Sequence, residues 1–192
     1  ATIVMPAQTP FAKVARTRAF GAKVVLEGRN LNECESTVNA LIQEHGLTLI
    51  HPYDNELVMM GQGTAGLEML TDQPDLDILV VPIGGGGLMS GIATIARDMR
   101  PNIKIYGVQT ELYPSMKLAV EDKEITCGGE TLAEGIAVKK PGGFTLPVVD
   151  ALVDDILLVD ERDLEWAVGA LIEQQRVVSE GAGAAGIAAI HA

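Results

Sequence analysis

The chain has few of the residues that form disulfide-bonded or zinc-centred proteins. Its 192 residues include two cysteines and three histidines. Cys34 and Cys127 are far apart, and neither lies in a CxxC or Cys/His ligand spacing. This pattern argues against a disulfide framework and a zinc site, and it fits a reducing compartment. We therefore expect a cytoplasmic protein with no metal centre.

Basic residues and long apolar runs are also scarce. The chain carries 14 Lys and Arg against 26 Asp and Glu, a formal net charge of -12. Most of its surface would therefore repel nucleic-acid phosphates and anionic lipid. No stretch approaches the roughly 20 apolar residues of a membrane span, and the first residues show no secretory pattern. We expect neither nucleic acid nor membrane as a partner.

Hydrophobic residues and glycine are abundant. Hydrophobic residues make up 47% of the chain, glycine occurs 21 times, and aromatic residues reach only 4%. The mean hydropathy is +0.23. These values are typical of a globular protein with a sizeable core, which forms one large domain or one domain and part of a second. Because the chain starts directly with a strand-like run at 2–5, we expect it to be an internal fragment of a longer protein.

The first fifty residues alternate between strand and helix patterns. Short apolar runs predict strands at 2–5, 23–26 and 47–50, and apolar positions at helical spacing predict a helix between each pair. Asn30 with Glu33 forms a plausible capping pair for the second helix. This βαβαβ order predicts a parallel sheet with covered faces.

The same alternation continues after His51. Asp54 can cap a helix whose Gly61, Gly63 and Gly66 indicate close packing against a neighbour. The apolar run at 77–83 is typical of a central parallel strand. A helix at about 88–100 and a strand at 103–109 follow it.

The last third of the chain contains a glycine-rich segment, 127–144, that we interpret as a long functional loop. Residues 155–159 then predict a strand. Asp160 with Asp163 predicts a helix start. Small residues at 179–186 lead into an Ala-rich helix.

The most informative motif is Gly84-Gly85-Gly86-Gly87, directly after the buried strand and before a helix. Glycine lets the backbone adopt positive φ and lets an anion approach the positive helix end closely. We interpret the run as a phosphate cradle. Two alternatives stay open: a tight turn without a ligand, and a dinucleotide site in which Gly85, Gly87 and Ser90 nearly match GxGxxG and Glu111 would bind the ribose.

Several motifs occur in the order typical of one family: TIVMP, AKVVLEG, HPYDNELVMMGQGTAGLE, VVPIGGGGLMSGIA, IYGVQTE, TLAEGIAVKKPG, LVDDILLV and VVSEGAGAAG. The whole chain resembles the serine/threonine dehydratase and serine racemase family of pyridoxal-phosphate (PLP) enzymes, and within it the threonine dehydratases. The resemblance implies an α/β chain with the tryptophan synthase β-like fold (fold type II), with parallel sheets and helices on both faces. It also implies two domains, both incomplete: residues 1–50 from the small domain and 51–192 from the large PLP-binding domain.

The resemblance assigns roles to particular residues. The cradle for the cofactor phosphate would be Gly84, Gly85, Gly86, Gly87 and Leu88. Gly135, in LAEGIA, would place its carbonyl beside the cofactor ring, and Glu180, in SEGAGA, would be an acid near the ring and the substrate. The alternatives are a simple turn at Gly135 and a solvated helix cap at Glu180.

The chain also departs from the family pattern. The family's Schiff-base lysine and its serine-glycine-asparagine loop would lie upstream of Ala1, so no catalytic lysine is assigned. Glu111 matches an acid that serine racemases use for a divalent cation, but its expected partner position falls near Met116 and Lys117. We therefore interpret Glu111 as structural and predict no metal. Tyr53 stands where some relatives have an asparagine that contacts the cofactor.

The resemblance implies deamination of L-threonine to 2-oxobutanoate and ammonia, in amino-acid catabolism or isoleucine biosynthesis. L-serine dehydratase and serine racemase are the close alternatives. A module of another class, which binds phosphate or another subunit without catalysis, also stays open. We expect an amino-acid substrate and a homo-oligomer.

Overall fold

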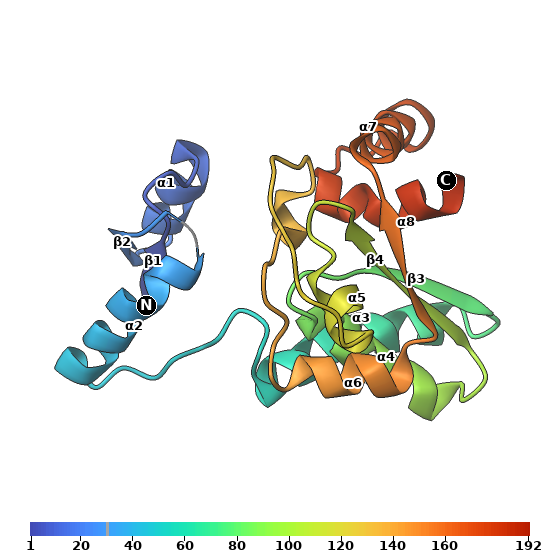
Figure 1. Cartoon of the computed structure of the whole chain (residues 1–192), viewed down its shortest axis with the longest axis horizontal. Helices are drawn as coiled ribbons and strands as arrows, with labels where there is room; N and C mark the ends of the chain where they lie inside the picture. The colour runs from blue at the N-terminus through green and yellow to red at the C-terminus, as the bar shows by residue number, and fades with distance from the viewer. Residues whose placement is uncertain (30) are drawn as a thin grey trace. The chain divides into compact units, whose positions relative to one another are not determined.

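The computed structural model describes residues 1–29 and 31–192, with the backbone alone at 31 and 32 (Figure 1). These residues form two compact units, Ala1–Ile50 and His51–Ala192. The capping residue predicted at Asn30 lies outside the described residues. Within the described part of the chain, no helix has the length and apolar character needed to cross a membrane.

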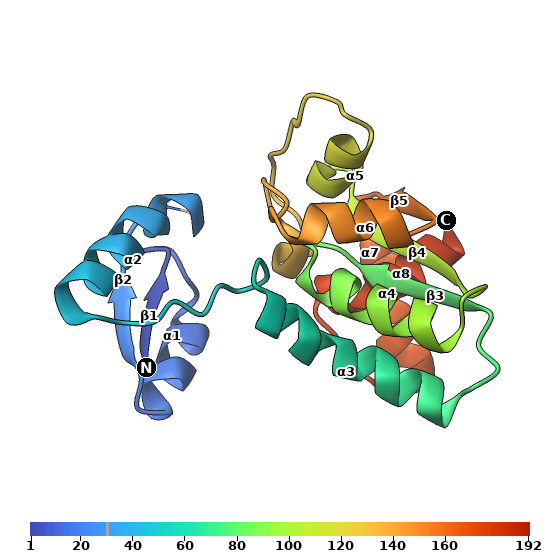
Figure 2. The same cartoon turned by 90° about the horizontal axis from the view of Figure 1, so that it is seen from below.

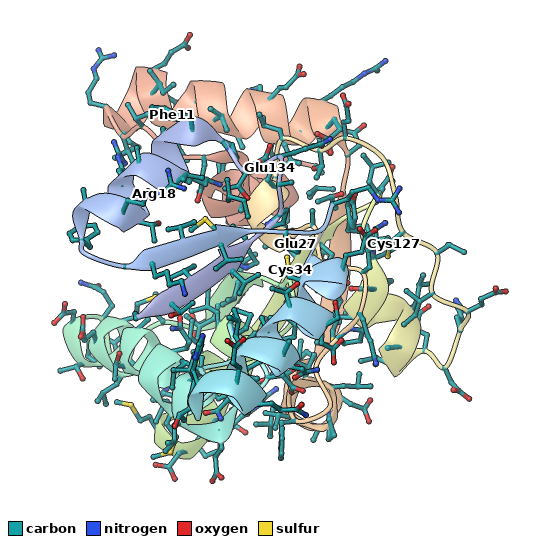
Figure 3. The ribbon with its side chains drawn as sticks, turned by 90° about the vertical axis from the view of Figure 1, so that its left-hand side faces the viewer. Phe11, Arg18, Glu27, Cys34, Cys127 and Glu134 are labelled. Carbon is teal, nitrogen blue, oxygen red and sulfur yellow. The ribbon has the colours of Figure 1, made fainter. Side chains whose placement is uncertain are left out.

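The first unit is a strand-helix-strand-helix arrangement. Its elements are β1 (Thr2–Met5), α1 (Phe11–Ala19), β2 (Lys23–Leu26) and α2 (Leu31–His45). The two strands pair in parallel, and α1 forms the crossover that such pairing requires. Cys34 of α2 is buried, and its thiol donates a hydrogen bond to the Glu27 carbonyl at 3.1 Å (Figure 3). Burial raises the pKa of this thiol, and the nearby negative Glu33 and Glu27 raise it further.

The strand predicted at 47–50 is wrong. Residues 47–50 follow α2 without regular structure, and Leu49 and Ile50 are exposed. A short apolar run becomes a strand only where a neighbouring strand offers it hydrogen bonds. Among the described residues, β1 and β2 pair only with each other.

The second unit is built on a three-stranded parallel sheet. Its strands are β3 (Ile78–Pro82), β4 (Lys104–Thr110) and β5 (Asp155–Val159), in the order β3-β4-β5. The helices are α3 (Glu56–Asp72), α4 (Gly87–Met99), α5 (Ser115–Val120), α6 (Thr145–Leu152), α7 (Glu161–Ala170) and α8 (Gly181–His191), with a 3-10 turn η1 (Glu134–Ile136) and a π turn η2 (Leu171–Gln175).

Helices cover both faces of this sheet. In Figures 1 and 2, α3, α4, α5 and α6 lie on one side, and α7 and α8 lie on the other. Leu79 and Val81 of β3 belong to the core beneath α4, whereas Val80 packs against the core beneath α8. Both faces of the strand are covered, as predicted. The predicted central position is wrong, because among the described residues β4 is the central strand and β3 lies at the edge of the sheet; an apolar run shows that both faces are covered but does not specify the strand order.

Gly63 and Gly66 of α3 allow a close approach to α4, as the sequence predicted, whereas the prediction is wrong for Gly61, where a Cβ would meet nothing within 4 Å. A Cβ added to Gly63 would lie 3.0 Å from the Gly91 carbonyl oxygen, and one added to Gly91 would overlap the Met59 carbonyl oxygen. The predicted cap of α3 is wrong by one residue. The side chain of Asn55, not that of Asp54, accepts hydrogen bonds from the first turn of α3. Asp54 instead binds the start of α6, as described below.

The remaining predictions had mixed outcomes. The capping box of Asp160 and Asp163 at α7 is confirmed. Helices α5 and α6 were not predicted, since α5 is only six residues long and α6 contains Pro147. Helix α8 begins at Gly181, so the small residues lie inside the helix rather than before it.

Candidate functional site

The four glycines Gly84–Gly87, called the glycine loop below, lie at the carboxyl end of β3 and lead directly into α4. Gly85, Gly86 and Gly87 are buried. For the N–H groups of Gly85, Gly86, Gly87 and Leu88, no hydrogen-bond partner occurs among the described residues. Buried N–H groups are costly when they lack a partner. This arrangement at a helix N-terminus suits an anion.

Gly86 is the residue at which glycine is required. Its φ of +98° is left-handed, and it stands at the N-cap position of α4. A side chain there would be strained by the backbone conformation. It would also be crowded, because a Cβ would lie 2.6 Å from Met116 Cε and 2.7 Å from Thr145 Oγ1.

The carbonyl groups of Gly85 and Gly86, unlike their N–H groups, have partners. The Gly85 carbonyl accepts a hydrogen bond of 2.6 Å from the Thr145 hydroxyl and one of 3.3 Å from the Gly142 N–H. The Gly86 carbonyl accepts one of 2.8 Å from the Ser90 N–H. Hydrogen bonds to these carbonyl oxygens therefore hold the loop in place, and its N–H groups remain available to a ligand.

Tyr53 packs directly against the glycine loop. A Cβ on Gly85 would overlap its ring, and a Cβ on Gly87 would lie 3.0 Å from its Cα. The Tyr53 hydroxyl donates a hydrogen bond of 3.2 Å to the Lys140 carbonyl. His51 supports the same segment, since its Nδ1 accepts hydrogen bonds from the Tyr53 and Asp54 N–H groups at 3.3 and 2.7 Å. The resemblance named Tyr53 only as a departure, so its packing role was missed.

Gly135 lies in η1, next to the glycine loop. A Cβ on Gly84 would be 3.5 Å from the Gly135 carbonyl oxygen, and a Cβ on Gly135 would be 2.9 Å from Ala182 Cβ. The segment before η1 is anchored by Glu161, whose Oε2 accepts a hydrogen bond of 2.8 Å from the Leu132 N–H. The structure therefore brings the glycine loop, Gly135 and the start of α8 together.

Glu180 stands at the N-cap position of α8, and it is exposed. Its carbonyl accepts hydrogen bonds from the Gly183 and Ala184 N–H groups. Within the described residues, its carboxylate makes no capping hydrogen bond. The side chain is thus not used to cap the helix.

Glu111 follows β4 and is exposed, and its N–H donates a hydrogen bond to the Val159 carbonyl. In residues 1–29 and 31–192, no group of three or more His, Cys, Asp and Glu side chains is placed to hold a metal ion. Lys117, the basic residue near the expected partner position, forms ion pairs with Glu121 and Asp155 at 3.4 and 3.3 Å.

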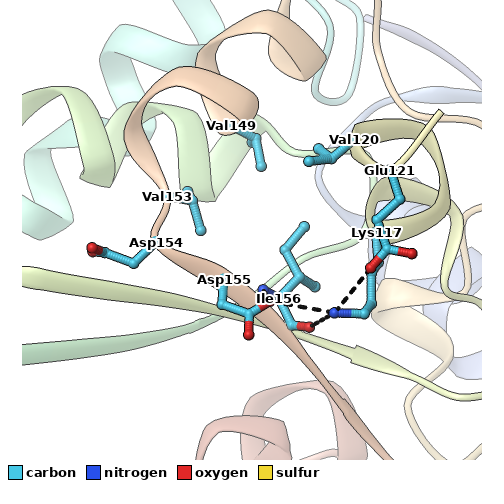
Figure 4. A pocket seen from close by; sticks show the side chains of 8 residues that line it. All are labelled: Lys117, Val120, Glu121, Val149, Val153, Asp154, Asp155 and Ile156. Atoms are coloured by element: carbon cyan, nitrogen blue, oxygen red, sulfur yellow. Dashed lines mark hydrogen bonds and ion pairs between the residues drawn. The ribbon is translucent and has the colours of Figure 1, made fainter.

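A small pocket of about 100 Å³ surrounds Lys117 (Figure 4). Its lining comes from α5, α6 and β5 and the residues that flank them, and it includes no residue of the glycine loop. The Lys117 ammonium also donates a hydrogen bond of 2.7 Å to the Ile156 carbonyl. The Lys117 ammonium is therefore bound to acceptors of the protein. The pocket is separate from the candidate site, because no residue of the glycine loop lines it.

Comparison with known proteins identifies the family. The family model described as pyridoxal-phosphate dependent enzyme matches residues 1–192. The chain belongs to this family. It is 44% identical to an L-threonine ammonia-lyase of Thermotoga maritima, over 99% of the chain and 48% of that protein. It is 46% identical to an L-threonine ammonia-lyase of Geobacter sulfurreducens, over 98% of the chain and 48% of that protein.

A solved structure supports the same placement among pyridoxal-phosphate dependent enzymes. The chain matches maize serine racemase with a TM-score of 0.93 and 32% identity, over all of the chain and 60% of that structure. The predicted α/β fold of the PLP enzymes is confirmed. The chain spans about half the length of the curated relatives it matches.

The glycine loop fits the phosphate of the family's cofactor. Four neighbouring N–H groups have no partner among the described residues. The sides of Gly85, Gly86 and Gly87 where Cβ atoms would stand are packed against Tyr53, Met116 and Thr145, so the glycines let the loop pack closely while its N–H groups stay available. The donors lie at the positive end of α4, a helix of 13 residues. The donor set suits an anion better than a neutral group.

Proposed function

We propose that the complete protein is a PLP-dependent L-threonine ammonia-lyase, which converts L-threonine to 2-oxobutanoate and ammonia. The observation that carries this proposal is the 44% to 46% identity to two L-threonine ammonia-lyases over nearly the whole chain. The proposal includes a cytoplasmic homo-oligomer acting in amino-acid metabolism, in catabolism or in isoleucine biosynthesis. Residues 1–50 would belong to the small domain, and residues 51–192 would form most of the large domain.

The glycine loop would hold the cofactor phosphate through backbone N–H groups. Gly84–Gly87 and Leu88 form the cradle in this proposal. A hydrogen bond to a charged group contributes about 1.5 to 3 kcal/mol, and the helix dipole contributes up to about 2 kcal/mol. Three or four such donors suffice for retention without a lysine at the phosphate.

Gly135 and Glu180 would act at the other end of the cofactor. The Gly135 carbonyl would face the ring, in line with its place beside the glycine loop. Glu180, whose carboxylate does not cap α8, would orient polar groups of the ring or the substrate. When bound, the cofactor supplies an electron sink for the carbon from which the substrate loses its α-proton.

The overall reaction balances without an added oxidant or reductant. L-threonine loses its α-proton and its β-hydroxyl as water, and the resulting enamine takes up water and releases ammonia. The product is 2-oxobutanoate. L-serine would give pyruvate by the same steps.

Serine racemisation is the second candidate, favoured by the match to maize serine racemase. The experiment is a set of three assays on the complete protein loaded with PLP: 2-oxo acid formation from L-threonine and L-serine, D-serine formation, and cysteine formation with sulfide. We expect 2-oxobutanoate formation to be the fastest. Faster racemisation or cysteine synthesis would refute the ammonia-lyase assignment, and bound cofactor without any product would favour a non-catalytic module.

A further inference from the structure

We propose that Thr145 is a positioning residue that aims the Gly86 N–H at the cofactor phosphate. This inference rests on the proposed function only for the identity of the anion. The hydrogen bond on which it is based, from the Thr145 hydroxyl to the Gly85 carbonyl, joins two groups of this chain. The buried Thr145 hydroxyl on α6 would then determine how tightly the glycine loop, which lies outside α6, binds an anion.

The first step is the orientation of one peptide group. The Thr145 hydroxyl is fully buried and lies 2.6 Å from the Gly85 carbonyl oxygen. The peptide bond between Gly85 and Gly86 is trans, so its C=O and N–H point in opposite directions. Because Thr145 holds the C=O toward α6, the Gly86 N–H points away from α6.

The second step concerns the space around Gly86. The side of Gly86 where a Cβ would stand is occupied by Met116 Cε at 2.6 Å and by Thr145 Oγ1 and Cβ at 2.7 and 2.8 Å. Thr145 therefore both bonds the preceding carbonyl and fills the volume beside Gly86. The loop keeps its left-handed turn, and an anion can approach only from the remaining side.

The third step is that Thr145 is itself held from two other elements. The Asp54 carboxylate accepts hydrogen bonds from the Gly143 and Phe144 N–H groups, directly before α6. The Ser90 hydroxyl of α4 donates to the Thr145 carbonyl at 3.3 Å. The position of the Thr145 hydroxyl is therefore set relative to both α4 and the segment that precedes α3.

The test compares three variants of the complete protein. Thr145→Val removes the hydroxyl and keeps a similar shape, and Thr145→Ser keeps the hydroxyl. Thr94→Val is the matched control, because it makes the same change at a hydroxyl that bonds only a carbonyl within α4. Affinities for PLP and for inorganic phosphate are measured by titration, and folding is checked by circular dichroism.

We expect Thr145→Val to lower both affinities about 10- to 100-fold, the effect of losing one favourable contact to a charged ligand. Thr145→Ser should restore binding to within about threefold of the wild type, and Thr94→Val should bind like the wild type. Equal binding by wild type and a folded Thr145→Val would overturn the inference and leave the proposed function intact. A wild type that binds neither PLP nor phosphate would refute the proposed cofactor site, and the inference with it.

A measurement on the wild type covers the case in which Thr145→Val does not fold. The amide resonance of Gly86 is followed by nuclear magnetic resonance during a titration with inorganic phosphate. We expect a saturable downfield shift of the Gly86 proton, as a direct N–H donor to an anion would show. A Gly86 resonance that stays in place while phosphate binds would overturn the inference.

Discussion

Asp54 and Phe144 lie 90 positions apart in the chain, yet the Asp54 carboxylate accepts a hydrogen bond of 2.7 Å from the Phe144 N–H. Its second oxygen accepts one of 2.8 Å from the Gly143 N–H. Both donors lie directly before α6, where the helix leaves N–H groups without internal partners. One carboxylate thus connects the segment before α3 to the helix that carries Thr145.

The first prediction concerns this contact. Asp54→Ala should lower the free energy of unfolding by about 1 to 2 kcal/mol, because it removes the acceptor for two N–H groups at a helix start. Urea unfolding of the complete protein measures the change. Asp150→Asn, at an exposed position on α6, is the control and should change it by less than about 0.5 kcal/mol. Equal effects of the two variants would contradict the capping role.

The second prediction concerns Gly86. Gly86→Asp should abolish cofactor retention, because a carboxylate about 4 Å from a phosphate charge costs about 4 kcal/mol at an effective dielectric of 20. Gly86→Ala should also weaken retention, but less than Gly86→Asp. Alanine is strained at a φ of +98°, and its Cβ would be crowded by Thr145. Gly128→Ala is the control, since a Cβ there meets nothing within 4 Å. Retention is measured as the PLP to protein ratio after dialysis, and an unchanged ratio in Gly86→Asp would remove the loop from the site.

The third prediction concerns the contact between α3 and α4. Gly91→Ala would place a methyl group on the Met59 carbonyl oxygen, so we expect a loss of about 1 to 3 kcal/mol in the free energy of unfolding. Gly61→Ala, in α3, has nothing within 4 Å and should stabilise the protein by about 0.5 to 1 kcal/mol. Thermal and urea unfolding measure both changes. Stabilisation by Gly91→Ala would show that the helices are less closely packed.

The fourth prediction is a dependence of stability on pH. Burial alone would raise the pKa of Asp154, but hydrogen bonds from the Ile105 N–H, Lys104 and Arg97 outweigh it and lower the pKa from 3.8 to about 2. A pKa that is lowered in the folded state adds stability above the unfolded value, and this stability is lost as the pH falls through the folded value. We therefore expect stability to decrease between about pH 4 and pH 2.

Asp154→Asn tests this dependence. The variant should be less stable than the wild type at pH 7 by about 1 to 3 kcal/mol, and the difference should shrink between about pH 4 and pH 2. Urea unfolding at several pH values measures it. Asp72→Asn, at an exposed acid at the end of α3, is the control for loss of one negative charge. A constant difference at all pH values would contradict the prediction.

Local patterns in the sequence predicted most of the helices and strands. The strands at 2–5, 23–26 and 155–159 were predicted with the bounds that β1, β2 and β5 have, because their apolar runs end at Pro6, Glu27 and Asp160. The strand at 47–50 was wrong, since pairing depends on a neighbour that the run itself does not specify. Helix α6 was missed because it contains Pro147 and because the segment before it is held by Asp54, which is distant in the chain.

The candidate site was only partly predictable. The sequence alone indicates an anion cradle at the four successive glycines after a buried strand, because a turn without a ligand does not require so many. Tyr53, Asp54 and Thr145 carry no such local signal. Each is an ordinary residue in its own segment, and it reaches the glycine loop or its supports only after the second unit has folded.

The sequence by itself determined the α/β alternation, the strand buried on both faces, the place of the glycine loop and the family. These features depend on residue type and spacing within one segment, where side-chain volume, backbone freedom and periodicity act locally. Only the tertiary structure decided which groups hold the loop. The Gly85 carbonyl accepts a hydrogen bond from a hydroxyl 60 positions away. Asp54 binds the segment before α6 rather than the first turn of α3. These partners are distant in the chain, and only packing brings them together.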